Sequence, residues 1–87
     1  MILRYLNPFA ADYKSLPQQI QLQVDKALHR LQQNPHHPSL HAKRIKGTQD
    51  LWEGRVTLAY RFTFNWQADV VTLRRVGTQD ILKKESK

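Results

Sequence analysis

The spacing of apolar residues changes once along this chain, near residue 34. Between residues 17 and 33 the apolar side chains recur every three or four positions, as on one face of a helix: they are Ile20, Val24, Ala27, Leu28 and Leu31. The prolines of residues 34–38 end this pattern, because a residue that precedes proline disfavours the helical conformation. From residue 51 onward the chain is rich in Val, Thr, Phe, Tyr and Trp, which is typical of strands. The sequence therefore predicts helices in the first half and a sheet built mainly from the second half.

The expected order is a strand, two helices and four strands, followed by a short tail helix. We expect strands at 1–6, 41–47, 51–56, 59–64 and 70–76, helices at 7–16 and 17–33, and one or two helical turns within 78–87. Asn7 is the expected N-cap of the first helix, with Pro8 at its first position, where the missing N–H costs nothing. Tight connections are expected at residues 57–58 and 65–69. This order predicts an α+β fold, with two helices on one face of a small, mainly antiparallel sheet and the other face partly open.

The length and composition restrict the class of protein. Eighty-seven residues make a single domain, 1–87, with one compact core. The chain has no cysteine, which excludes disulfides and thiolate zinc sites and fits a reducing, cytoplasmic setting. It has no apolar run of about 18 residues, so we expect no membrane span, and its N-terminal apolar stretch is too short for a signal peptide. No feature of the sequence predicts a cofactor.

The chain carries a large excess of positive charge. Fourteen Lys and Arg residues face seven Asp and Glu residues, which gives a formal charge of +7. Such an excess favours polyanionic partners such as nucleic acid or an acidic protein. Many of the cations lie in the second half, at Lys43, Arg44, Lys46, Arg55, Arg61, Arg74, Arg75, Lys83 and Lys84. Because most of these lie within expected strands, we predict a nucleic-acid-binding face rather than a generic solubilising surface.

Alternation along the strands sorts these cations between the two faces of the sheet. With Ile45, Trp52 and Phe62 pointing toward the helices, the outward side chains are Arg44, Lys46, Glu53, Arg55 and Arg61. The last strand allows two registers. Val71 and Leu73 favour one register, which adds Arg74 to the outward set and leaves Arg75 on the helix side, whereas Val70 and Val76 favour the other. The pattern predicts a concave cationic face with one acid, Glu53, suited to a phosphate chain.

The tetrapeptide Gly-Thr-Gln-Asp occurs twice, at residues 47–50 and 77–80. We interpret both copies as turns that end a strand, in which glycine supplies a positive φ while Thr and Asp accept hydrogen bonds from following N–H groups. In the second copy, Thr78 is the expected N-cap of the tail helix. Gln79 and Asp80 are expected at the rim of the cationic face.

The order and spacing of four motifs resemble the RelE/ParE superfamily of bacterial toxins from type II toxin–antitoxin systems. The motifs are residues 43–47, 52–56, 60–61 and 71–77. The two preceding helices match in place and length, so the resemblance covers nearly the whole chain. It implies either a RelE-like endoribonuclease that cleaves mRNA in the ribosomal A site, which we favour, or a ParE-like inhibitor of DNA gyrase. Both kinds of toxin are neutralised by a cognate antitoxin protein.

The resemblance carries over to particular residues. It implies that Lys46, Arg55 and Arg61 bind the transcript and stabilise charge at the scissile phosphate. With the other cations of the second half, the candidate nucleic-acid-binding set is Lys43, Arg44, Lys46, Arg55, Arg61, Arg74, Arg75 and Lys83. Attack of a ribose 2′-hydroxyl on the adjacent phosphate needs stabilised phosphorane oxygens and two proton transfers. Glu53 is the candidate base, and Gln79 completes the candidate catalytic set by its position.

The chain departs from the family after its last strand. Many family ribonucleases carry His-Arg there, whereas this chain has Thr78-Gln79. Gln79 cannot exchange a proton near neutral pH, so the general acid is another residue, or the ribosome, or is absent. The departure keeps two alternatives open: the gyrase inhibitor, and a catalytically degenerate module that binds nucleic acid or antitoxin.

The histidines and tryptophans are further candidates for the site. His37 and His41 are four residues apart, but Pro38 opposes the helix that would align them, so we expect no metal site. His41 precedes the basic strand and is a candidate acid/base group, although a loop histidine without such a role is the simpler interpretation. Trp52 is expected in the core, and Trp66, in the expected turn, is expected to be exposed toward RNA or antitoxin.

Overall fold

The computed structural model describes the backbone of residues 1–85 and the side chains of residues 1–83, so the last part of the expected tail helix lies outside the described residues. The elements in chain order are β1 (Ile2–Tyr5), α1 (Asn7–Ser15), α2 (Gln18–Gln33), the 3-10 turn η1 (Pro38–Leu40), β2 (Lys43–Arg44), β3 (Leu51–Arg55), β4 (Tyr60–Gln67), β5 (Val70–Thr78) and α3 (Ile81–Glu85). The predicted α+β class and element order are confirmed. No helix among the described residues is long and apolar enough to cross a membrane.

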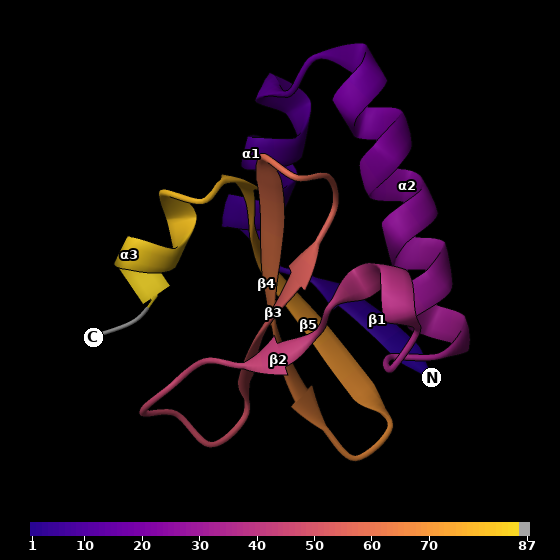
Figure 1. The fold of residues 1–87 in the computed structure, drawn as a ribbon, viewed down its shortest axis with the longest axis vertical. Coiled ribbons are helices and arrows are strands. Elements are labelled where there is room, and N and C mark those ends of the chain that lie inside the picture. Colours follow the sequence, from indigo (N-terminus) through magenta and orange to yellow (C-terminus); the bar gives the residue numbers. More distant parts are fainter. Residues whose placement is uncertain (86–87) are drawn as a thin grey trace.

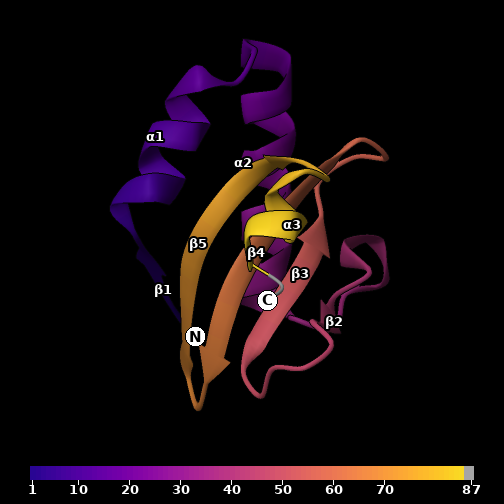
Figure 2. The same cartoon turned by 90° about the vertical axis from the view of Figure 1, so that its left-hand side faces the viewer.

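The five strands form one sheet in the order β1-β5-β4-β3-β2 (Figure 1). β1 pairs parallel with β5, and the other neighbours are antiparallel. Helices α1 and α2 pack on one side of the sheet, whereas α3 lies against the opposite side (Figure 2). The face that the sequence predicted to be partly open is therefore covered in part by the short tail helix.

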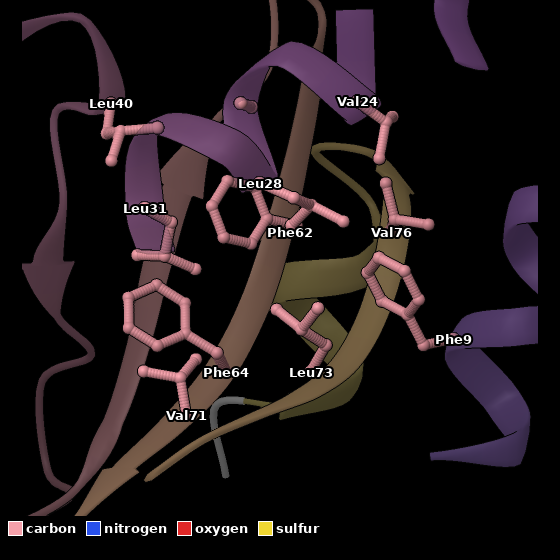
Figure 3. Close-up of a cluster of buried hydrophobic side chains, with 11 residues drawn as sticks. Phe9, Val24, Leu28, Leu31, Leu40, Phe62, Phe64, Val71, Leu73 and Val76 are labelled. Carbon is pink, nitrogen blue, oxygen red and sulfur yellow. The ribbon is translucent and has the colours of Figure 1, made fainter. Parts of the chain in front are cut away.

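The core lies between the sheet and the two long helices (Figure 3). Its members from the helices are Phe9, Val24, Ala27, Leu28 and Leu31, which include four residues of the predicted apolar stripe. Its members from β4 and β5 are Phe62, Phe64, Val71, Leu73 and Val76. Burial of these side chains is the main stabilising contribution to a domain of this size.

A β-bulge in β5 explains why the last strand allowed two registers. Thr63 pairs with Arg75, but the next residue, Phe64, pairs with Leu73, so Arg74 is an extra residue between the two pairs. A bulge of this kind reverses the alternation of side chains on the strand that contains it. Leu73 and Val76 therefore both face the core, although strict alternation would place them on opposite faces.

Two predicted boundaries are wrong. The N-cap of α1 is Leu6, which makes no side-chain cap bond, and Asn7 is already the first helical residue. β4 continues through residues 65–67, where the sequence predicted a turn, because Asn65 and Trp66 pair with Thr72 and Val71 of β5. The actual turn is at residues 68–69, with Ala68 at a φ of 51°.

The two copies of Gly-Thr-Gln-Asp adopt different structures. In the first, Gly47 has the predicted positive φ, 85°, and the Thr48 hydroxyl donates to the carbonyl of Ile45 at 2.7 Å. In the second, Gly77 is an ordinary strand residue of β5 opposite Arg61, and Thr78 ends that strand instead of capping α3. Gly77 leaves room for the tail helix, since a Cβ atom there would lie 3.1 Å from Ile81 Cγ2.

Gly54 of β3 marks the tightest packing between the sheet and the core. A Cβ atom at this position would lie 2.4 Å from Cζ of the fully buried Phe62. We therefore expect Gly54→Ala to lower the free energy of unfolding by about 1–3 kcal/mol, because a well-packed core tolerates no added methyl group without strain. Urea denaturation measures this loss. Ala59→Gly, in the connection before β4, is the control for backbone entropy, and an unchanged midpoint for Gly54→Ala would contradict the expected clash.

Candidate nucleic-acid interface

Cross-strand pairing determines which polar residues share the side of the sheet that faces away from α1 and α2. One row runs from Lys43 through Glu53 to Thr63, and the next from Arg55 through Arg61 to Gly77. Directly opposite residues point to the same side of a sheet. We call this side, which carries these six residues, the outer face.

A hollow of ≈ 340 Å³ opens at the β2–β4 end of the outer face, lined by His41, Ala42, Lys43, Glu53, Arg55 and Arg61. We call it the basic hollow. Four segments build it: the segment that joins η1 to β2, the start of β2, strand β3, and the start of β4. Four residues of the predicted nucleic-acid-binding and catalytic sets, Lys43, Glu53, Arg55 and Arg61, therefore meet in one cavity.

Arg61 is buried, with 9% of its surface exposed, rather than lying on an open face. Its Nη1 donates to the carbonyls of Thr57, Leu58 and Tyr60, which belong to the connection between β3 and β4 and to its own strand. These bonds satisfy the carbonyls of a tight connection and hold the guanidinium in one place. They use a single nitrogen of the planar fork, so further donors remain for a ligand in the hollow.

Arg55 lies directly opposite Arg61 on the neighbouring strand. Two like charges in this position destabilise a sheet unless something offsets them. The Nε of Arg55 is also buried and has no hydrogen-bond partner among the residues that the structure describes. A buried donor without an acceptor costs free energy. Both features would be relieved by an anion bound in the basic hollow.

Thr63 is a feature of the outer face that the sequence did not single out. Its side chain is fully buried, and its Oγ1 finds no hydrogen-bond partner within the described part of the chain. Thr63 pairs with Glu53 across the sheet, so a buried hydroxyl stands next to the carboxylate that lines the hollow. Thr63 shares the parity of Arg61 on β4, but alternation carries no signal of its burial.

Glu53 is the one carboxylate that lines the basic hollow. It pairs with Lys43 of β2 and shares the cavity with both arginines. A carboxylate accepts protons and hydrogen bonds but donates neither.

His41 reaches the hollow because of an unusual backbone conformation. It has a φ of 45°, in the left-handed region, and its N–H donates to the carbonyl of Pro38 at 3.2 Å. The chain is fixed on both sides, by the buried side chain of Leu40 and by the pairing of Lys43 with Glu53. The side chain of His41 is exposed and lines the cavity.

The remaining predicted cations of β2 lie elsewhere. Arg44 pairs with Trp52, whose ring packs against the core, so Arg44 is exposed on the helix side and the prediction that it points outward is wrong. That prediction assumed that Ile45 faces the helices. Ile45 is buried but is not part of the core cluster, and it follows the outward-facing Lys43 by two residues. Lys46 is exposed in the turn that follows and does not line the basic hollow.

The cations of β5 are engaged in contacts within the protein. Arg74, at the bulge, donates from Nη1 to Oδ1 of Asn65 at 3.0 Å. Arg75 forms an ion pair with Asp12 of α1, with Nε 2.7 Å from Oδ2, and the backbone N–H of Val76 donates to the same oxygen. The contacts of Asp12 attach α1 to β5 beyond the end of β1.

Two further predicted site residues lie near the tail helix. Gln79 is exposed in the segment between β5 and α3, and Lys83 is exposed on α3. Neither lines the basic hollow. The short segment between β5 and α3 therefore adds no proton donor or acceptor to this cavity.

The tryptophans form an aromatic cluster on the helix side of the sheet. The Trp52 and Trp66 rings lie 5.2 Å apart, and the ring of His36 lies 5.3 Å from that of Trp66. Both tryptophans are half-buried and pack against the core, which confirms the expectation for Trp52 and contradicts that of a turn residue for Trp66. No group of three or more metal-ligating residues occurs in the described part of the chain.

No family model and no curated protein matches this sequence, but several solved structures match its fold. YafQ from E. coli strain BL21(DE3) superposes with a TM-score of 0.77 at 15% identity, covering 92% of this chain and 94% of that one. The YoeB/ParE toxin from Agrobacterium tumefaciens gives 0.77 at 14% identity, over 91% and 99%. The chain has the RelE/ParE toxin fold.

A structure of the RelB–RelE antitoxin–toxin complex from Methanococcus jannaschii belongs to the same group, with a TM-score of 0.72 at 21% identity over 97% and 99% of the two chains. The RelE/ParE fold that the sequence motifs predicted is thereby confirmed. In this chain the fold brings the basic hollow to the side of the sheet opposite the two long helices.

Proposed function

We propose that this chain is the toxin of a type II toxin–antitoxin pair and that it inhibits translation by cleaving mRNA on the ribosome. The observation that supports cleavage is the basic hollow, where Arg55 faces the anchored Arg61 beside a single carboxylate, Glu53, and where the Nε of Arg55 has no partner among the described residues. The shared fold with YafQ and with RelE-containing complexes supports the toxin role.

The residues of the hollow match the chemistry of attack by a ribose 2′-hydroxyl. Arg55 and Arg61 donate to the nonbridging oxygens of the scissile phosphate, where negative charge develops. Glu53 takes the proton from the 2′-hydroxyl, whose oxygen then attacks the phosphorus. Lys43 binds the phosphate chain beside the cavity. The products are a 2′,3′-cyclic phosphate and a free 5′-hydroxyl.

A cognate antitoxin is the expected protein partner. The neighbouring folds include toxins solved with RelB bound. A chain with a formal charge of +7 favours a partner with an acidic segment. Such a segment would neutralise the toxin by masking the basic hollow.

Inhibition of DNA gyrase is the alternative that the replacement of His-Arg by Thr78-Gln79 favours. A gyrase inhibitor performs no proton transfer and tolerates Gln79. Supercoiling by purified gyrase, measured with and without micromolar toxin, separates the two functions. Unaffected supercoiling together with new transcript ends supports cleavage.

Expression of the chain without an antitoxin is expected to arrest growth and to produce new 5′ ends within translated regions of a reporter transcript, mapped by primer extension. Glu53→Gln is nearly isosteric but accepts no proton, so we expect the number of new ends to fall by at least about 100-fold. Asp69→Asn, a similar change at an exposed turn residue, is the matched control and is expected to cleave normally. Growth arrest without new ends would remove the ribonuclease proposal.

A further inference from the structure

The cleavage reaction proposed above lacks a proton donor for its second half. When the bond between phosphorus and the 5′ oxygen breaks, that oxygen needs a proton. Three residues that line the basic hollow, Lys43, Arg55 and Arg61, bind phosphate as cations. Glu53, which also lines it, is the proposed base. Gln79, at the position where relatives carry His-Arg, does not line the hollow and cannot supply a proton.

We propose that His41 is the general acid of this site, which protonates the leaving 5′ oxygen; this proposal rests on the proposed ribonuclease function. His41 is the one histidine that lines the basic hollow. It enters the cavity from the segment between η1 and β2, whereas Glu53 enters from β3. An acid and a base on separate elements can serve the two ends of one phosphodiester.

The backbone of His41 supports a role in the site. A non-glycine residue in the left-handed region is uncommon, and such residues gather at functional sites when their surroundings hold them in place. Here the buried Leu40 and the pairing of Lys43 with Glu53 supply that support. The conformation at His41 turns the chain from η1 into β2 at the mouth of the hollow.

The other three histidines are placed for different contacts. His29 is exposed on α2, which covers the opposite side of the sheet. His36 packs against Trp66, and Nδ1 of His37 accepts a hydrogen bond from the backbone N–H of Ser39. None of these three lines the basic hollow.

Charged side chains surround His41 in the hollow. The cavity presents Lys43, Arg55 and Arg61 against the single carboxylate of Glu53. In the step itself, Glu53 receives the 2′ proton, the 2′ oxygen bonds to phosphorus, and the 5′ oxygen leaves with the proton of His41. Proton exchange with solvent then restores both residues.

A leaving group that needs no proton tests this assignment. The experiment uses purified full-length chain, ribosomes, and an mRNA whose mapped cleavage site carries either the natural 5′ oxygen or a bridging 5′ sulfur. A thiolate leaves without protonation because a thiol is far more acidic than an alcohol. His41→Gln is expected to cleave the natural linkage about 100- to 10,000-fold more slowly than wild type, and the sulfur linkage at nearly the wild-type rate.

Two matched variants make the result specific. Glu53→Gln lacks the base and is expected to remain slow on both linkages, and His29→Gln is expected to match wild type on both. His41→Gln that cleaves the natural linkage at the wild-type rate would overturn the assignment, as would equal slowing on both linkages, which indicates a structural or binding role. If the wild type cleaves neither mRNA, the proposed function is overturned, and this inference with it.

Discussion

Arg55→Gln is expected to slow transcript cleavage on ribosomes about 100- to 1,000-fold, the usual effect of removing one donor from a site of developing negative charge. Arg55 is a stronger test of the basic hollow than Arg61. Its Nε has no acceptor among the described residues, and its positive charge repels that of Arg61 on the neighbouring strand. Its removal takes away an unsatisfied donor and a like-charge pair, so we expect little loss of stability. Arg61→Gln, in contrast, also breaks bonds to three carbonyls of the chain.

The measurement combines single-turnover cleavage of a ribosome-bound mRNA with thermal denaturation of the free protein. Lys26→Gln is the matched control, since it removes the same charge from an exposed residue of α2 that does not line the hollow. Equal loss of cleavage in both variants would indicate that net charge alone matters. An unfolded Arg55→Gln protein would show that the residue stabilises the sheet and would contradict the ligand-binding interpretation.

Phe62→Ala is expected to lower the free energy of unfolding by about 3–5 kcal/mol. Phe62 is fully buried, its ring stacks on that of Phe64 with centroids 5.5 Å apart, and it covers Gly54 on the neighbouring strand. Truncation removes this burial and leaves a cavity in the only large apolar core of the described residues. Since small domains have total stabilities of about 5–15 kcal/mol, a large part of the population is expected to be unfolded at 37 °C.

Urea denaturation followed by circular dichroism measures the loss. Leu22→Ala is the control, because Leu22 lies on α2 with 55% of its surface exposed and is expected to change stability by less than about 1 kcal/mol. Similar midpoints for the two variants would contradict the position of Phe62 at the centre of the core.

Residues next to one another in the chain carried enough information to predict most of the fold. The spacing of Val24, Ala27, Leu28 and Leu31 predicted the buried face of α2, and alternation predicted that Phe62 and Phe64 point inward. Turn predictions were less successful, because a local preference for turns at residues 65–67 is weaker than pairing with two neighbouring strands. The identical tetrapeptides show the same effect, since only the first of them makes a turn with a positive φ at glycine.

The candidate site was predictable only in part. The parity of β3 and β4 correctly grouped Glu53, Arg55 and Arg61, because each strand is long and regular. The short β2 was assigned the wrong register, so Lys43 occupies the place expected for Arg44. His41 was one of several loop histidines by sequence, and its proximity to Glu53 depends on a left-handed residue that periodicity does not reveal.

The sequence by itself determined the order of the elements, their apolar faces and the cationic character of the second half, since each of these follows from contiguous residues and their spacing. Only the tertiary structure decided which cations meet a carboxylate and a histidine in one hollow, and which are used elsewhere. Arg75 and Asp12, which lie 63 residues apart, form an ion pair because α1 packs beside β5, and Arg61 is buried because nearby carbonyls need its donors. Contacts of this kind depend on how strands pair and helices pack, and no local pattern of residues encodes them.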